Sequence, residues 1–97
     1  MENAEDLTVE YEEDGRVVIE QLDKVILSKG AWATIVFKYR DWDRRKEEMG
    51  PVKYTIRGYQ KRNGAFRQQA KFNISSVKQG RGLVDALSQW LAQDETP

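Results

Sequence analysis

The chain has 97 residues, of which 39% are hydrophobic and 33% are charged, and it contains neither cysteine nor histidine. This length fits one domain, and no apolar run reaches the ~18 residues needed to cross a bilayer. The lack of cysteine and histidine excludes disulfides, thiolate chemistry and histidine catalysis. Because no spaced carboxylate pair or phosphate-binding loop takes their place, we expect a non-enzymatic protein without cofactor or metal, located in the cytoplasm, nucleoid or nucleus.

A formal net charge of zero hides a division of charge along the chain. Seven acidic residues and no basic residue lie between Met1 and Gly15, whereas eight basic residues and no acidic residue lie between Gly50 and Val84. Such asymmetry indicates a polyanionic partner and an acidic tail. Clustered charges on a solvated surface are the simpler interpretation, but eight basic residues with no acidic residue among them favour a binding function.

Taken in chain order, the pattern predicts an acidic flexible tail over residues 1–14, with a short strand possible at 8–12. Alternating or β-branched residues predict strands at Val17–Ser28, Trp32–Trp42, Val52–Lys61 and Phe66–Ile74. The charged stretch 43–51 is expected to be an exposed loop. Ser75 or Ser76 opens a helix with a capping box reaching Gln79, and residues 93–97 form a second flexible tail.

These elements predict an α+β fold of class ββββα: one domain over residues 15–92, with a curved antiparallel sheet of four or five strands followed by one C-terminal helix. The Asn63-Gly64 pair marks the tip of the last hairpin. We expect a three-residue loop there, because it pairs Arg57 with Gln69 and Thr55 with Lys71 and so separates basic from apolar side chains.

In that register one sheet face is apolar and receives the helix, while the other gathers cations and aromatic rings. Cations bind phosphates and flat rings stack on bases, so the pattern favours single-stranded nucleic acid, although a solubilising exterior would also carry lysines. The candidate nucleic-acid-binding residues are Lys38, Arg40, Trp42, Lys53, Arg57, Tyr59, Lys61, Arg67, Lys71 and Asn73.

The C-terminal helix carries an apolar stripe and two glycines, Gly80 and Gly82, which each cost about 1 kcal/mol relative to alanine. A partner helix packed closely there would explain the glycines; plain tolerance near a helix end is the alternative. Because the core is thin for a chain of this length, we expect a homodimer through the helices. Its interface residues would be Gly82, Val84, Leu87, Trp90 and Leu91.

Three segments carry a resemblance to a known family: Gly30-Ala31-Trp32, Lys53-Tyr54-Thr55-Ile56-Arg57 and Phe72-Asn73-Ile74-Ser75. Together with the element order they resemble the transcriptional coactivator family called positive cofactor four, including its small bacterial relatives. The resemblance implies a homodimer that pairs through its helices and holds single-stranded DNA on curved sheets with little sequence preference. It also places Lys53, Arg57 and Tyr59 on the binding surface, while the 43–51 connection and the short hairpin loop depart from the family.

The sequence thus predicts a non-catalytic protein that binds single-stranded DNA or RNA, has a coactivator-like role in transcription regulation, and does not associate with membranes. The alternative is a protein-interaction module whose basic sheet binds an acidic partner protein.

Overall fold

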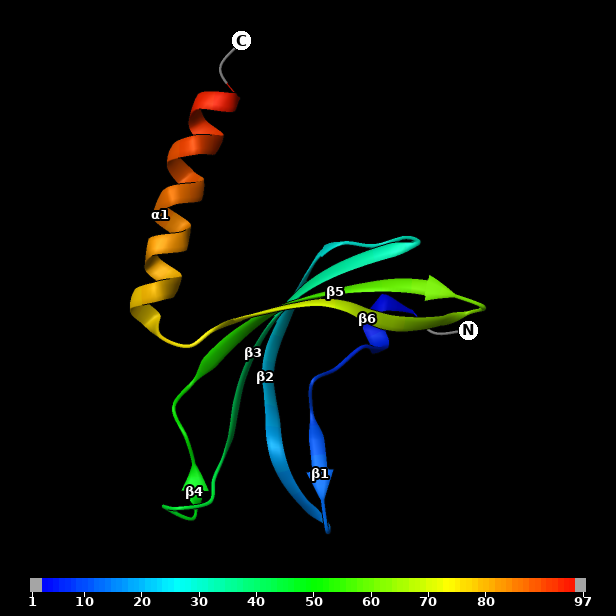
Figure 1. Cartoon of the computed structure of the whole chain (residues 1–97), viewed down its shortest axis with the longest axis vertical. Helices are drawn as coiled ribbons and strands as arrows, with labels where there is room; N and C mark the ends of the chain where they lie inside the picture. Colours follow the sequence, from blue (N-terminus) through cyan, green and yellow to red (C-terminus); the bar gives the residue numbers. More distant parts are fainter. Residues whose placement is uncertain (1–2, 96–97) are drawn as a thin grey trace.

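The computed structural model describes residues 3–95, which form a strongly curled antiparallel sheet and one C-terminal helix (Figure 1). The strand order is β1-β2-β3-β5-β6, with the short β4 paired to the end of β3. The predicted α+β class is confirmed, but the sheet has six strands. The elements are η1 Ala4–Asp6, β1 Tyr11–Glu13, β2 Arg16–Ser28, β3 Trp32–Asp43, β4 Glu48–Met49, β5 Lys53–Arg62, β6 Ala65–Ile74 and α1 Val77–Asp94.

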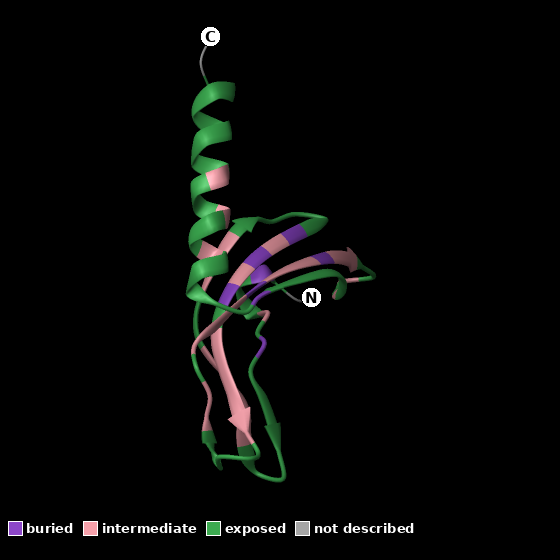
Figure 2. Ribbon diagram, turned by 60° about the vertical axis from the view of Figure 1, so that its left-hand side comes forward, coloured by how far each residue is buried: buried purple, intermediate pink, exposed green. Residues whose placement is uncertain are grey.

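The sheet has two faces of different character, here named by the β3 residues that point to them. The inner face carries Ala33, Ile35 and Phe37, and the outer face carries Thr34 and Val36 and lies on the side of α1 (Figure 2). Register shifts interrupt β2 opposite β3 at two places, and another interrupts β6 opposite β5. Such bulges increase the local twist and curl the sheet towards its inner face.

The hydrophobic core lies on the inner face. Ala33, Ile35 and Phe37 of β3 are fully buried, and Tyr59 of β5 is 6% exposed. Ala4 and Val9, which belong to the N-terminal segment, complete the same cluster. Because only seven apolar residues of the described chain are buried, the fold of one chain rests on a small core.

The N-terminal segment lies against the sheet rather than standing free as the expected flexible tail. Ala4 is 4% exposed and Val9 is 8% exposed on the inner face, and Tyr11–Glu13 pair with β2 as an edge strand. This covering supplies apolar contact that the sheet lacks on that side. Of the predicted tails, residues 1–2 and 96–97 lie outside the described part of the chain.

The expected three-residue hairpin loop is wrong. Arg62 pairs with Ala65, so Asn63 and Gly64 alone form the turn, with φ of 52° and 79°. Both residues are left-handed, as a type I′ turn requires, and Asn-Gly is the pair that best adopts that geometry. The turn chemistry therefore overrides the separation of basic and apolar faces near the tip.

The 43–51 connection was expected to be an exposed loop, but it contains β4 and forms a tight hairpin with β3. Trp42 pairs with Met49, and the Gly50 amide donates to the Asp41 carbonyl at 2.8 Å. The Asp43 carboxylate accepts from the backbone amides of the next residues of the turn, which stabilises the bend locally.

Helix α1 begins where the capping pattern predicts it. The Ser76 hydroxyl accepts from the Gln79 amide at 3.1 Å, and the Gln79 side chain accepts from the Ser75 amide at 3.0 Å. The helix stands away from the sheet over most of its length (Figure 2), so no residue of it is buried. Within residues 3–95 no helix is long and apolar enough to cross a membrane.

Candidate nucleic-acid interface

The inner face brings together six of the ten predicted binding residues. The β3–β5 register pairs Phe37 with Thr55 and Tyr39 with Lys53, so alternate residues of β5 share a face with the core. β6 then adds the partners of Thr55 and Arg57. The predicted residues on this face are Lys53, Arg57, Tyr59, Lys61, Lys71 and Asn73.

Arg57 stands at the centre of this group and is held by a hydrogen-bond network. Its Nε donates to the Thr55 hydroxyl at 3.2 Å, and its Nη1 donates to the Gln68 amide oxygen at 2.8 Å. The buried Thr55 hydroxyl in turn donates to the Asn73 amide oxygen at 2.8 Å. These neutral partners fix the guanidinium in place without neutralising its charge.

Lys71 is the direct cross-strand partner of Arg57, so two cations stand side by side. The four ion pairs of the described chain involve neither residue. Like charges placed opposite one another on a sheet are destabilising. The pair is therefore a local concentration of positive charge that an anion would relieve.

The inner-face cations of β5, here called the β5 cation row, are Lys53, Arg57 and Lys61. The two ends of this row have different environments. Lys53 approaches the Asp41 carboxylate at 3.2 Å and is partly neutralised. At the hairpin end, the Lys61 ammonium lies 5.3 Å from the centre of the Phe66 ring, a cation–π distance. Phe66 and Tyr39 are partly buried rings that border the inner face.

Tyr59 is not an exposed stacking platform. It lies in the core beneath the N-terminal segment, and burial raises its pKa above the ordinary value while the charge of nearby Arg57 acts in the opposite direction. A nucleobase could reach this ring only after the N-terminal segment moves away.

The other four predicted binding residues, Lys38, Arg40, Trp42 and Arg67, lie on the outer face. Lys38 pairs with Tyr54, so the even-numbered residues of β3 lie on the other face of the sheet from the β5 cation row. Arg67 pairs with Gln60 because of the two-residue turn. Arg40 is already matched, since its Nε lies 2.5 Å from the Glu20 carboxylate.

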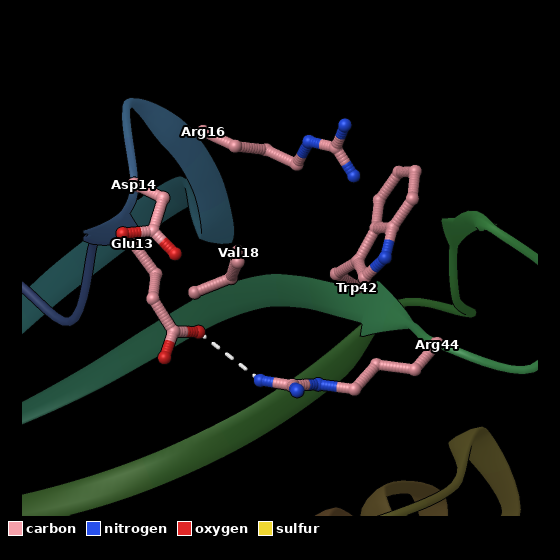
Figure 3. Close-up of a pocket in the computed structure, with 6 residues that line it drawn as sticks. All are labelled: Glu13, Asp14, Arg16, Val18, Trp42 and Arg44. Atoms are coloured by element: carbon pink, nitrogen blue, oxygen red, sulfur yellow. Dashed lines mark hydrogen bonds and ion pairs between the residues drawn. The ribbon is translucent and has the colours of Figure 1, made fainter.

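Trp42 belongs to a shallow open pocket at the far end of the sheet, formed by the β1–β2 hairpin and the end of β3 (Figure 3). The Arg16 guanidinium lies 4.9 Å from the centre of its ring. Arg44 forms an ion pair with Glu13 at 3.0 Å across the same pocket. Trp42 thus has an intramolecular cation–π partner and is separated from the Arg57–Lys71 pair by the thickness of the sheet.

Sequence reasoning missed two kinds of residue. Gln68 holds Arg57 but was assigned to no face, because the assumed loop length put Gln69 there instead. Lys24 shares the inner face as the partner of Phe37, and its position in an imperfectly alternating strand gave no usable signal.

The predicted helix-interface residues are mostly exposed. Leu87 is 43%, Val84 51%, Leu91 52% and Trp90 59% exposed. At 3.6 residues per turn Gly82 lies about 140° around the helix from Leu87, so the two residues are on different sides of α1. A Cβ added at Gly82 would meet open space. It is Gly80 that faces the sheet, since a Cβ added there would lie 3.6 Å from the Ile74 side chain.

Comparison of the chain with protein-family models, curated proteins and solved structures found no match.

Proposed function

We propose that the protein binds single-stranded DNA or RNA on the inner face, without catalysis, through the cations of β5 and β6. The observation that carries this proposal is the Arg57–Lys71 pair, two neighbouring cations with no carboxylate partner in the described chain. Phosphate oxygens are the ligands that would relieve their repulsion. Lys53 and Lys61 extend the same row along β5.

A single strand fits this surface better than a duplex because rings border the cations. Tyr39 and Phe66 edge the inner face near Lys53 and Lys61. Stacking on such rings contributes about 1–3 kcal/mol per base and needs unpaired bases. A role in transcription like that of the coactivators which the chain resembles is part of the proposal and rests on that resemblance.

The proposal includes a homodimer formed through the outer face and α1. An apolar groove runs between the helix and the outer face, lined by Val36, Ile56, Leu83 and Leu87 among others. Trp90 and Leu91 continue the apolar surface along the helix beyond the sheet. A second copy presents the same helix, so one two-fold arrangement can cover both grooves.

The direct test is a fluorescence-anisotropy titration with labelled oligo-thymidine, the matched duplex and poly-glutamate, at about 50 and about 200 mM salt. We expect the single strand to bind more tightly than the duplex and its affinity to fall steeply with salt. Equal affinity for duplex would contradict the single-strand proposal. Preferential binding of poly-glutamate would favour the acidic-partner alternative.

A further inference from the structure

The N-terminal segment occupies the same inner face that carries the cation row. Ala4 and Val9 are buried against a cluster that includes Phe37 and Tyr59. In Figure 1 the segment and η1 lie inside the curl of the sheet, near the ends of β5 and β6. The residues of this strap, defined here as residues 3–10, include the acids Glu5, Asp6 and Glu10.

Two lysines hold the strap by contacts that resemble phosphate binding. The Lys24 ammonium donates to the backbone carbonyls of Glu5 and Leu7, the latter at 2.7 Å. The Lys29 ammonium lies 2.6 Å from the Glu5 carboxylate, and this contact is the main cause that lowers the Glu5 pKa below its ordinary value. Both lysines thus bind oxygen atoms of Glu5 in η1, and Lys24 also binds the carbonyl of Leu7 just after it.

A third contact orients the strap along β2. The side-chain oxygen of Gln21 accepts from the Thr8 hydroxyl at 2.6 Å and from the backbone amide of Val9 at 3.2 Å. The backbone amide of Gln21 donates to the Glu10 carboxylate at 3.2 Å. The strap therefore lies beside β2 and within reach of the Lys24 side chain.

The strap is held weakly enough to be displaced. Both side chains of the Lys29–Glu5 ion pair are more than half exposed, and exposed ion pairs contribute little to stability. Ala4 and Val9 are its only buried residues. Ordering the backbone of the strap also costs conformational entropy, which a strand that displaces the strap would release.

We propose that the strap is a built-in occupant of the binding face, which a nucleic-acid strand displaces. Its departure opens the Tyr59 ring and releases Lys24 and Lys29, which then bind phosphates beside Arg57 and Lys71. This inference rests on the proposed function. The apparent affinity of the whole chain is then the intrinsic affinity reduced by the fraction of molecules that are open.

The test compares the whole chain with a variant lacking residues 1–9 in oligo-thymidine titrations. We expect the shortened protein to bind about five-fold more tightly or better at low salt, because all of its molecules have the binding face open. The double change Asp94→Asn, Glu95→Gln removes acids from the other end of the chain and should leave affinity within two-fold. In the shortened protein, Lys24→Ala with Lys29→Ala should weaken binding and make the salt dependence shallower.

Equal or weaker binding by a folded shortened protein would overturn the strap proposal and leave the proposed function standing. Absence of binding by both proteins at low salt would instead overturn the proposed function.

Hydrogen exchange of the unaltered chain gives a second readout, should the shortened protein not fold. Oligo-thymidine should speed exchange of the Val9 amide, which donates to Gln21. Slower exchange at Val9 on binding would contradict displacement.

Discussion

Arg57 and Lys71 face each other as direct partners across β5 and β6 on the inner face of the sheet. A direct like-charge pair costs stability, whereas an opposite-charge pair contributes about 0.2–1 kcal/mol. The proposed binding of an anionic ligand on the inner face rests on this pair, because an anion between the two side chains would offset their repulsion.

The first prediction separates stability from binding. Lys71→Glu should raise the free energy of unfolding by about 0.2–1 kcal/mol because it replaces repulsion of Arg57 by attraction. The same change should weaken oligo-thymidine binding strongly. Urea unfolding and anisotropy measure the two effects. Arg67→Glu is the matched control: it lies on the same strand opposite Gln60 and should neither stabilise the fold nor weaken binding as much. A loss of stability in Lys71→Glu would contradict the pairing.

The second prediction concerns the burial of Tyr59. Tyr59→Ala should lower the free energy of unfolding by about 3–5 kcal/mol, since it removes a large ring from the core. Tyr11→Ala removes a ring that is 54% exposed and should change stability by no more than about 0.5 kcal/mol. Urea unfolding of both variants measures the difference, and equal stabilities would show that Tyr59 is not in the core.

The third prediction is alkaline sensitivity of the fold. Burial raises the pKa of Tyr59 in the folded protein above its unfolded value. Its neutral form is therefore favoured by folding, and this contribution is complete below the unfolded pKa near 10. The contribution is lost as pH rises through the folded pKa. Thermal unfolding at a series of pH values above 9 should show a steeper loss of stability in the unaltered protein than in Tyr59→Phe. Parallel loss in the two proteins would contradict the burial of the hydroxyl.

The fourth prediction tests the homodimer. Leu91→Glu places a charge on the exposed apolar side of α1, beyond the groove that its own sheet lines. We expect light scattering to give about twice the 11.3 kDa chain mass for the unaltered protein and the chain mass for this variant. Gln89→Glu, on the opposite side of the helix, should remain dimeric. A chain-mass value for the unaltered protein at micromolar concentration would contradict the dimer.

Local patterns in the sequence were enough to predict most of the secondary structure. The alternation in β3, the Asn63-Gly64 tip and the Ser76 helix cap each depend on neighbours within a few residues, and the structure has each at the expected place. β4 was missed because two residues bearing one charge and one methionine carry no periodic signal.

Long-range register was not predictable in the same way. The loop length was misjudged, yet Arg57, Lys71 and Asn73 still share a face because an extra residue in β6, Gln69, shifts the pairing beyond Gly58. The loop error and the missed bulge each shift the pairing by one residue, so together they move the partner of Arg57 by two residues, from the expected Gln69 to Lys71, and keep the expected face. Between the bulge and the tip only the loop error acts, so Arg67 lies on the face opposite to the expected one.

The assignment of β3 and β5 residues to common sheet faces was the error that moved most predicted binding residues. Assigning each sheet face a single character, apolar or basic, put Lys38 and Trp42 with the β5 cations. The inner face instead combines apolar β3 residues with basic β5 residues, and the strap buries the apolar part. In the sequence, the acidic N-terminal segment has the composition of a solvated tail. The burial of Ala4 and Val9 was not predictable from it, because these residues pack on a surface that exists only in the folded sheet.

The most direct measurement compares two charge removals on opposite faces of β5 and β6. The double change Arg57→Ala, Lys71→Ala removes the inner pair, and Arg67→Ala removes an arginine from the outer face. Oligo-thymidine titrations over a salt series should show weaker binding by the double variant. Its log–log slope should be shallower by about 1.4, because each phosphate that is no longer neutralised reduces the slope by about 0.7. Arg67→Ala should keep the affinity and slope of the unaltered protein. Loss of binding in Arg67→Ala with an unchanged slope in the double variant would contradict the inner face as the binding surface.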